Sequence, residues 1–266
     1  MELTILTDNT TRIDAYYLGE PGVSYYLEDG DARILFDTGY SDVYVRNAAK
    51  LGIDLTKVTA LALSHGHDDH TRGLLYFPET AEKLPIYAHP DIFEPKRYDG
   101  NSIGSPLTQQ EAARRFDLHL TVEPVRLSEH VTFLGQIPRT VEFENRSPIG
   151  EHLVDGQWQP DFLMDDSALV YQCDEGLWII TGCSHVGICN ITEYAKKLCR
   201  DERICGIIGG FHLLKMTSRV NKTVAYLKAQ QPKHLCPCHC TCFHARAAIH
   251  AQVPVEEVCV GDTLTL

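Results

Sequence analysis

Short apolar runs separated by polar turns dominate the first third of the chain. The runs cover residues 3–7, 23–28, 33–36 and 58–63, and Gly, Asp or Pro residues bound them. Their β-branched and aromatic residues are typical of β-strands. Between them, a segment that Ser41 can cap and Gly52 can end carries its apolar residues on one side, which predicts a short helix.

The middle of the chain differs from this pattern. Residues 90–162 are polar and contain many Pro and Gly residues, and only the stretch 108–116 has the periodicity of a helix. We interpret residues 90–162 as an insertion over the functional site, inside a single domain that covers residues 1–266.

Strand and helix patterns alternate in the last third of the chain. We expect a strand hairpin at 167–172 and 176–181, a helix opened by a capping box at 190–193, a strand at 204–209, a helix at 218–230 and a strand at 234–237. A region of strands followed by alternating strands and helices favours a layered α/β domain.

Composition narrows the classes of partner. The chain carries 24 Lys+Arg and 36 Asp+Glu in 266 residues, a formal net charge of −12. Hydrophobic residues at 44% and charged residues at 23% are typical of soluble globular proteins and exclude disordered or fibrous classes. An acidic chain attracts neither nucleic acid nor an anionic membrane, so we expect a small-molecule substrate. If that substrate is anionic, metal ions can hold it locally.

The N-terminal residues predict a location for the protein. They lead directly into a strand and lack the basic region of a secretory signal. No run approaches the ~18 apolar residues of a membrane span. We therefore expect a cytoplasmic protein whose ten cysteines are thiols.

The strongest chemical signal follows an apolar strand. Three histidines and two aspartates stand within residues 65–70, with Gly66 where the backbone must bend. Imidazoles and carboxylates are the usual ligands of Zn²⁺. A loop at a strand end can turn His65 and His67 toward one ion, and Asp69 and His70 toward a second. A polar surface turn is the alternative, and it explains this density of ligand types less well.

The spacing of His65, His67, Asp69 and His70 resembles the His-x-His-x-Asp-His signature of the metallo-β-lactamase superfamily. Residues 34–39 are similar to that superfamily's strand ending in Asp-Thr-Gly, in which Asp37 would orient the metal-binding loop. The resemblance implies a four-layer αβ/βα sandwich with metals at the sheet edges. It also implies two transition-metal ions, zinc before Mn²⁺ or Fe²⁺, and a metal-bound hydroxide as nucleophile.

A narrower resemblance covers most of the chain. Asn9 and residues 135–139, 165–169, 181–185, 209–213 and 237–241 are similar to the branch of the dihydropterin–ribofuranosylaminobenzene phosphate synthase of methanopterin biosynthesis. By order along the chain, the resemblance implies Asp166 or its neighbour Asp165 as third ligand of the first metal. It also implies His239 as the last ligand.

The remaining ligand position departs from the superfamily pattern. Cys183 stands where a bridging Asp is usual, so we expect His185 to replace that Asp at the second metal. The residues expected to contact substrate or support the ligands are Asn9, Asp37, Asp165, Cys183 and Arg72. Arg72 can contact an anion or be solvated. Cys236, Cys238, Cys240 and Cys242 alternate along a strand, which argues against a separate zinc site and for packing.

These observations together favour a metal-dependent hydrolase acting on a phosphoester or phosphodiester. Asp69 would orient the water or accept its proton, and His212, after two glycines, would donate to the developing oxyanion or leaving group. A lactone or ester hydrolase is the alternative. A di-iron redox protein on the same fold is less favoured, because the relatives with di-iron centres usually have Glu at the position of His67. A non-catalytic metal sensor is less favoured because the set of ligands is complete.

Overall fold

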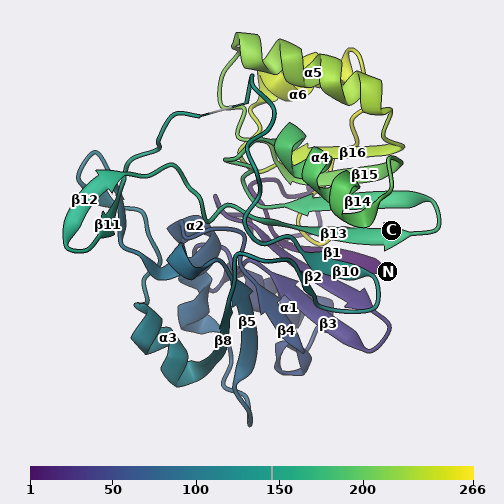
Figure 1. The fold of residues 1–266 in the computed structure, drawn as a ribbon. Coiled ribbons are helices and arrows are strands. Elements are labelled where there is room, and N and C mark those ends of the chain that lie inside the picture. The colour runs from purple at the N-terminus through teal and green to yellow at the C-terminus, as the bar shows by residue number, and fades with distance from the viewer. Residues whose placement is uncertain (145) are drawn as a thin grey trace.

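Two β-sheets packed face to face form the centre of the protein, as seen in a computed structural model that describes residues 1–144 and 146–266 (Figure 1). In spatial order the first sheet consists of β17 (Thr263–Thr265), β1 (Glu2–Thr7), β2 (Ser24–Asp29), β3 (Ala32–Phe36), β4 (Ala60–Ala62), β5 (Leu84–Ala88) and β8 (Phe116–Leu120). The second consists of β16 (His234–Cys238), β15 (Ile204–Gly210), β14 (Gly176–Thr181), β13 (Ala168–Cys173), β10 (Val131–Phe133) and β9 (Val125–Arg126).

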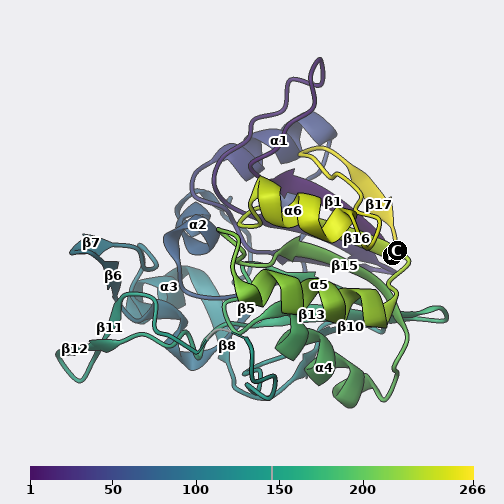
Figure 2. The ribbon, with the colours of Figure 1, turned by 90° about the horizontal axis from the view of Figure 1, so that it is seen from above.

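Helices lie on the outer faces of both sheets (Figures 1 and 2). The first sheet packs against α1 (Val43–Leu51) and α3 (Gln109–Arg115), and the second against α4 (Ile188–Cys199), α5 (Ser218–Gln230) and α6 (Phe243–His250). The short α2 (Asp68–Thr71) follows β4, and three 3-10 helices complete the set: η1 (Leu55–Lys57), η2 (Arg72–Tyr76) and η3 (Pro90–Phe93). This helix–sheet–sheet–helix arrangement confirms the expected four-layer sandwich.

The alternation of side chains along each strand builds three cores. In β14, Trp178 and Ile180 face the other sheet, whereas Leu177 and Ile179 face the helices. The same alternation places Leu35 of β3 in the core beneath α1. Successive side chains of a strand point to opposite faces, so a strand covered on both sides is apolar throughout. That is why these strands read as continuous apolar runs in the sequence.

The stretch 90–162 is not one insertion, and this expectation was wrong. It contains β8, β9 and β10, which belong to the two central sheets. Only β12 (Gln157–Pro160), β11 (Glu151–Val154), β6 (Lys96–Tyr98) and β7 (Asn101–Ser102) form a separate small sheet, which projects to the left in Figures 1 and 2. Strands β8 and β9 lie at sheet edges, where half of a strand can stay polar, so their sequences lack an apolar run.

Most helix ends agree with the sequence, but two N-termini differ. Asp42, not Ser41, is the N-cap residue of α1. The Thr108–Glu111 capping box opens α3, and Gly52 ends α1 with a φ of 75°. Helix α4, however, begins at Ile188 after Gly187, so Asn190 lies inside it. The Asn190 side chain instead accepts hydrogen bonds from the backbone N–H groups of residues 140 and 141. A tertiary contact has therefore taken the place of the expected cap.

The direction of the strands prepares the functional site. Strands β3, β4, β5 and β8 are parallel neighbours, and so are β14, β15 and β16. The carboxyl ends of parallel strands meet at one edge of a sheet, where open α/β sheets bind ligands. Among the described residues, no helix is long and apolar enough to cross a membrane.

Candidate metal centre

Three buried histidines converge where β4 and β14 end. The Nε2 atom of His65 lies 3.1 Å from Nδ1 of His67 and 3.1 Å from Nε2 of His185. Burial lowers the pKa of His65 and His185 well below the usual value, and lowers that of His67 to about 4. The three rings are therefore neutral near pH 7 and turn lone pairs toward a common point, as ligands of one metal ion do.

A second group lies directly beside the first. It consists of Asp69, His70, Cys183 and His239, and its ligand atoms lie within 4.8 Å of one another. The thiol of Cys183 is 3.3 Å from Nε2 of His70 and 3.2 Å from Nε2 of His239. An Asp69 oxygen lies 3.4 Å from each of the same two nitrogens.

The spacing of the second group fits a bound ion. Four tetrahedral ligands at ~2.0–2.3 Å from Zn²⁺ lie roughly 3.3–3.8 Å from one another. The distances of 3.2–3.4 Å between the ligand atoms are close to that range. The donor set of one carboxylate, one thiol and two imidazoles is typical of transition-metal sites. Both groups can therefore hold metal ions.

The carboxylate of Asp37, at the end of β3, orients the ligand loop. It accepts hydrogen bonds from the Ser64 backbone N–H and hydroxyl, both at 2.7 Å, and lies 2.7 Å from Nδ1 of His70. This contact places the His70 proton on Nδ1 and leaves Nε2 as the ligand atom. The Ser64 hydroxyl is also 2.9 Å from Nδ1 of His65. These contacts are the ones that the orienting role implied by the resemblance requires of Asp37.

The end of β14 must come very close to this loop. A Cβ on Gly182 would lie 2.3 Å from the Ser64 hydroxyl and 2.9 Å from Asp37. Two residues later, Ser184 has a φ of 57°, in the left-handed region. Because of this turn, Cys183 and His185 reach different ligand groups, although residues two apart on a strand would share one face.

His239 is supported by Asp8 and Asn9, which directly follow β1. Asp8 accepts a hydrogen bond from the His239 backbone N–H at 3.0 Å. The side-chain oxygen of Asn9 lies 3.2 Å from Nδ1 of His239, which leaves Nε2 for the ligand group. His239 itself has a φ of 48°, and such strained residues concentrate at functional sites.

A buried lysine holds the other side of the ligand loop. Lys96, on β6, donates to Asp161 at 2.7 Å and to Asp165 at 3.3 Å, and all three side chains are buried. Asp165 also accepts a hydrogen bond from the backbone N–H of Gly66 at 2.8 Å. A Cβ on Gly66 would lie 2.5 Å from a backbone carbonyl oxygen, so this position requires glycine. The small sheet is thereby connected to the ligand loop.

The structure places two predicted ligands, His185 and Asp166, and the predicted supporting residue Cys183 differently from the expectation. His185 joins His65 and His67 rather than the second group, and Cys183 occupies the position expected for His185. Asp166 belongs to neither group. One of its oxygens accepts from the backbone N–H of Val186 at 2.7 Å, and the other has no partner. The first group is thus completed from the loop after β14, not from the segment before β13.

Arg72 and His212 were both expected near the substrate, and the structure places them in different surroundings. Arg72 lies over the ring of Tyr40, 4.9 Å from its centroid, and its charge also acts on Asp68, which belongs to neither ligand group. His212, after β15, is beside them, with its ring centroid 4.3 Å from that of His185. Burial lowers the pKa of His212 to about 4, so its ring is a neutral hydrogen-bond donor near pH 7.

The thiols on β16 and directly after it are mostly packing residues. Cys236 and Cys238 lie in the core between the sheets, and no cysteine but Cys183 belongs to a ligand group among the described residues. Cys240 is different, because its sulfur accepts from the backbone N–H of His212 at 3.2 Å. All ten cysteines are free.

Sequence reasoning missed Lys96, Asp161, Ser64 and Asp8. Lys96 and Asp161 lie in a polar stretch that gives no apolar pattern to align, and each finds its partner across 65 residues of chain. Ser64 and Asp8 stand directly after strands that were recognised, so their position at strand ends was a usable signal.

The fold and the ligand set agree with known proteins. The sequence profile of the metallo-beta-lactamase superfamily matches residues 18–193. This chain belongs to that superfamily. It is 34% identical over 248 residues to the uncharacterized protein MJ0448 of Methanocaldococcus jannaschii, covering 91% of each chain.

Two further comparisons concern named relatives of this superfamily member. It is 30% identical to the 7,8-dihydropterin-6-methyl-4-(beta-D-ribofuranosyl)-aminobenzene-5'-phosphate synthase of M. jannaschii, covering 92% of this chain and 89% of that protein. The crystal structure of Tm1679, described as a metal-dependent hydrolase of the beta-lactamase superfamily, has a TM-score of 0.87 and 29% identity. That alignment covers 100% of this chain and 99% of the other.

The geometry predicts which substitutions remove metal. We expect His185→Ala to weaken binding at the three-histidine group by more than ~100-fold, because a direct ligand counts for more than the outer partners. Asp166→Asn should retain the metal content of the wild type. Elemental analysis of protein purified with added metal measures both, and loss of metal in Asp166→Asn would restore Asp166 as a ligand.

A second prediction concerns Lys96. Lys96→Met leaves two buried carboxylates without their cation, so we expect the free energy of unfolding to fall by about 3–5 kcal/mol. Lys57→Met is the control, because Lys57 pairs with Asp54 at the surface, where an ion pair contributes at most about 1 kcal/mol. Urea denaturation of both variants is the measurement. Equal losses would show that the buried cluster is not stabilising.

Proposed function

We propose that this protein is a metal-dependent hydrolase that acts on a phosphoester or phosphodiester. The observation that carries the proposal is the pair of adjacent ligand groups, built on one loop and closed by residues from β14 and β16. When bound, metal ions at such sites activate water and polarise the oxygen of an ester or phosphoester. The similarity to Tm1679 along the whole chain supports hydrolysis as the reaction.

The side chains around the two groups suit this chemistry. Burial opposes ionisation of Asp69, but in the metal-free protein the charge of His70, together with the charge and hydrogen bonds of both His70 and His239, holds its pKa well below the usual range, and a bound cation would supply the same positive charge when the two rings are neutral ligands. Asp69 therefore stays ionised, and its carboxylate can bind metal and orient a water molecule rather than store a proton. The neutral ring of His212 can donate a hydrogen bond to negative charge that develops on the substrate.

An acidic protein can bind an anionic substrate only where positive charge is supplied locally. A chain with a net charge of −12 repels anions at long range, so an anionic substrate needs cations at the site itself. Two metal ions supply that charge and favour an oxygen-rich anionic group. A lactone or other ester remains the second choice of substrate within the same reaction type.

A synthase is the second candidate function. The M. jannaschii relative that is 30% identical over most of the chain is named as a synthase with a phosphate-bearing product. Both candidates place a phosphate in or beside the same metal centre. A panel of bis(p-nitrophenyl) phosphate, p-nitrophenyl phosphate and a lactone, tested with each added metal, separates them, because only the hydrolase releases p-nitrophenol from the phosphoesters.

The proposal predicts a large effect at Asp69. Asp69→Asn should lower kcat on bis(p-nitrophenyl) phosphate by at least about 100-fold, because a carboxamide binds metal poorly and orients water less well. Asp68→Asn is the matched control, since Asp68 is adjacent and lies in neither ligand group. Rates are measured at saturating metal, with circular dichroism to confirm the fold. An unchanged rate in Asp69→Asn would contradict the hydrolase proposal.

A further inference from the structure

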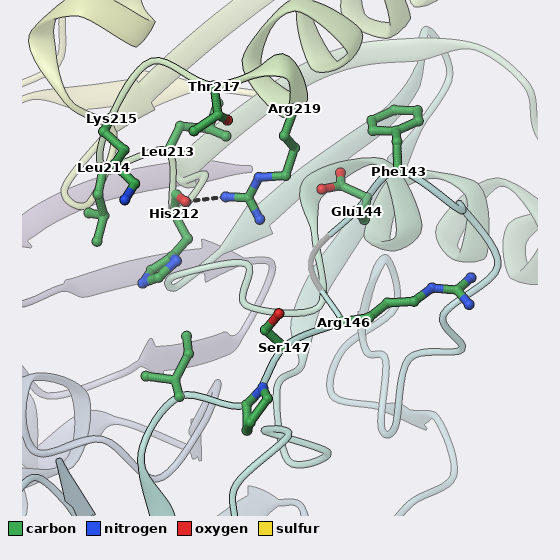
Figure 3. Close-up of a pocket in the computed structure, with 12 residues that line it drawn as sticks. Phe143, Glu144, Arg146, Ser147, His212, Leu213, Leu214, Lys215, Thr217 and Arg219 are labelled. Carbon is green, nitrogen blue, oxygen red and sulfur yellow. Dashed lines mark hydrogen bonds between the residues drawn. The ribbon is translucent and has the colours of Figure 1, made fainter.

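A pocket of about 500 Å³ opens beside the metal centre (Figure 3). One wall of the pocket consists of the segment after β15 and the start of α5, with His212, Lys215 and Arg219. The other wall is the segment that precedes β11, with Ser147. His212 belongs to both places, because its ring lies against His185 of the three-histidine group. A molecule bound at the metals can therefore extend into this pocket.

The pocket is basic in an acidic protein. Arg146, Lys215 and Arg219 line it, against the single acidic residue Glu144. Figure 3 shows Lys215 and Arg219 on the same wall as His212, whereas the guanidinium of Arg146 is turned away from that histidine. Lys215 makes no ion pair or hydrogen bond with any described residue. Its charge is therefore available to a ligand.

The one acidic side chain is already engaged. Glu144 is buried and accepts a hydrogen bond at 3.0 Å from the backbone N–H of Cys189, in the first turn of α4. It also packs against Gly187, where a Cβ would lie 2.3 Å from its carboxyl carbon. Glu144 thus balances the positive end of α4 and does not neutralise Lys215.

Arg219 has a defined position in the same wall. It lies in the first turn of α5, and its guanidinium donates a hydrogen bond to the backbone carbonyl of His212. One of the five N–H donors of a guanidinium is used there, which leaves others for an anion. The contact also ties the cationic wall to the histidine nearest the metal centre.

We propose that this pocket binds an anionic group of the substrate, a phosphate or a carboxylate, separate from the bond that is cleaved. The inference rests on the proposed function and extends it, because the substrate would carry two anionic groups, one at the metal centre and one in the pocket. The metal centre would hold the reacting group, and Lys215 with Arg219 would hold the second anion beyond His212. Fixing a remote group in this way positions the reacting bond.

The test measures binding to the metal-loaded full chain by isothermal titration calorimetry. The probes are benzylphosphonate, phenylacetate and 2-phenylethanol, which share an aromatic ring and differ in the anion, and none has an ester bond. Lys215→Gln removes the unpaired charge. Lys228→Gln is the matched control, because it removes an exposed lysine of α5 that lies about 13.5 Å along the helix from Arg219, outside the residues that line the pocket.

We expect Lys215→Gln to weaken binding of an anionic probe about tenfold, as loss of a charged hydrogen bond does, and Lys228→Gln to change it less than twofold. Loss for benzylphosphonate alone identifies a phosphate, and loss for phenylacetate as well shows that a carboxylate is also accepted. Equal affinities in the two variants overturn the inference. So does an equal loss for 2-phenylethanol, because the contact would then not depend on charge.

The pocket inference and the hydrolase proposal can fail independently of each other. If no ester is hydrolysed but anion binding still depends on Lys215, the pocket stands and the hydrolase proposal fails. If esters are hydrolysed and Lys215→Gln binds every probe as the control does, the hydrolase stands and the pocket inference fails.

Discussion

The contact of the Asp37 carboxylate with Ser64 and His70 is the constraint on which the site depends. It joins the end of β3 to the loop after β4 through three buried contacts of 2.7 Å. A buried carboxylate is stable only when its oxygens are satisfied, so the loop cannot leave this position at low cost. Because the same contacts orient His70 directly and His65 through Ser64, one carboxylate sets the geometry of both ligand groups.

The parallel strands explain why distant residues meet there. The ligands come from the ends of β4, β14 and β16, and His212 from the end of β15. Each side chain therefore stands at a strand end or in the short segment with α2 that follows β4, rather than on a long loop, which keeps ligand positions fixed before any metal binds. Gly182 permits the close approach of the two sheets at this edge.

Charge is distributed unevenly around this centre. The surface as a whole is acidic, yet Lys96 is buried beside the ligand loop and Lys215 and Arg219 line the neighbouring pocket. Lys96 is matched by two carboxylates and has a structural task. Lys215 and Arg219 face open space next to His212, where a ligand can use them. The two sets of cations therefore differ in their surroundings, because one is buried and paired and the other lines a pocket.

The sequence by itself determined the ligand types and the strands. The six residues from His65 to His70 lie close together whatever the fold, and continuous apolar runs marked β1 to β4 because both faces of those strands are buried. Only the tertiary structure decided which group His185 and Cys183 join, since one left-handed residue, Ser184, separates their directions. It also decided that Asp166 stays apart from the ligands and that Lys96 supports them. Those contacts depend on where distant strand ends meet, and local pattern does not encode that meeting.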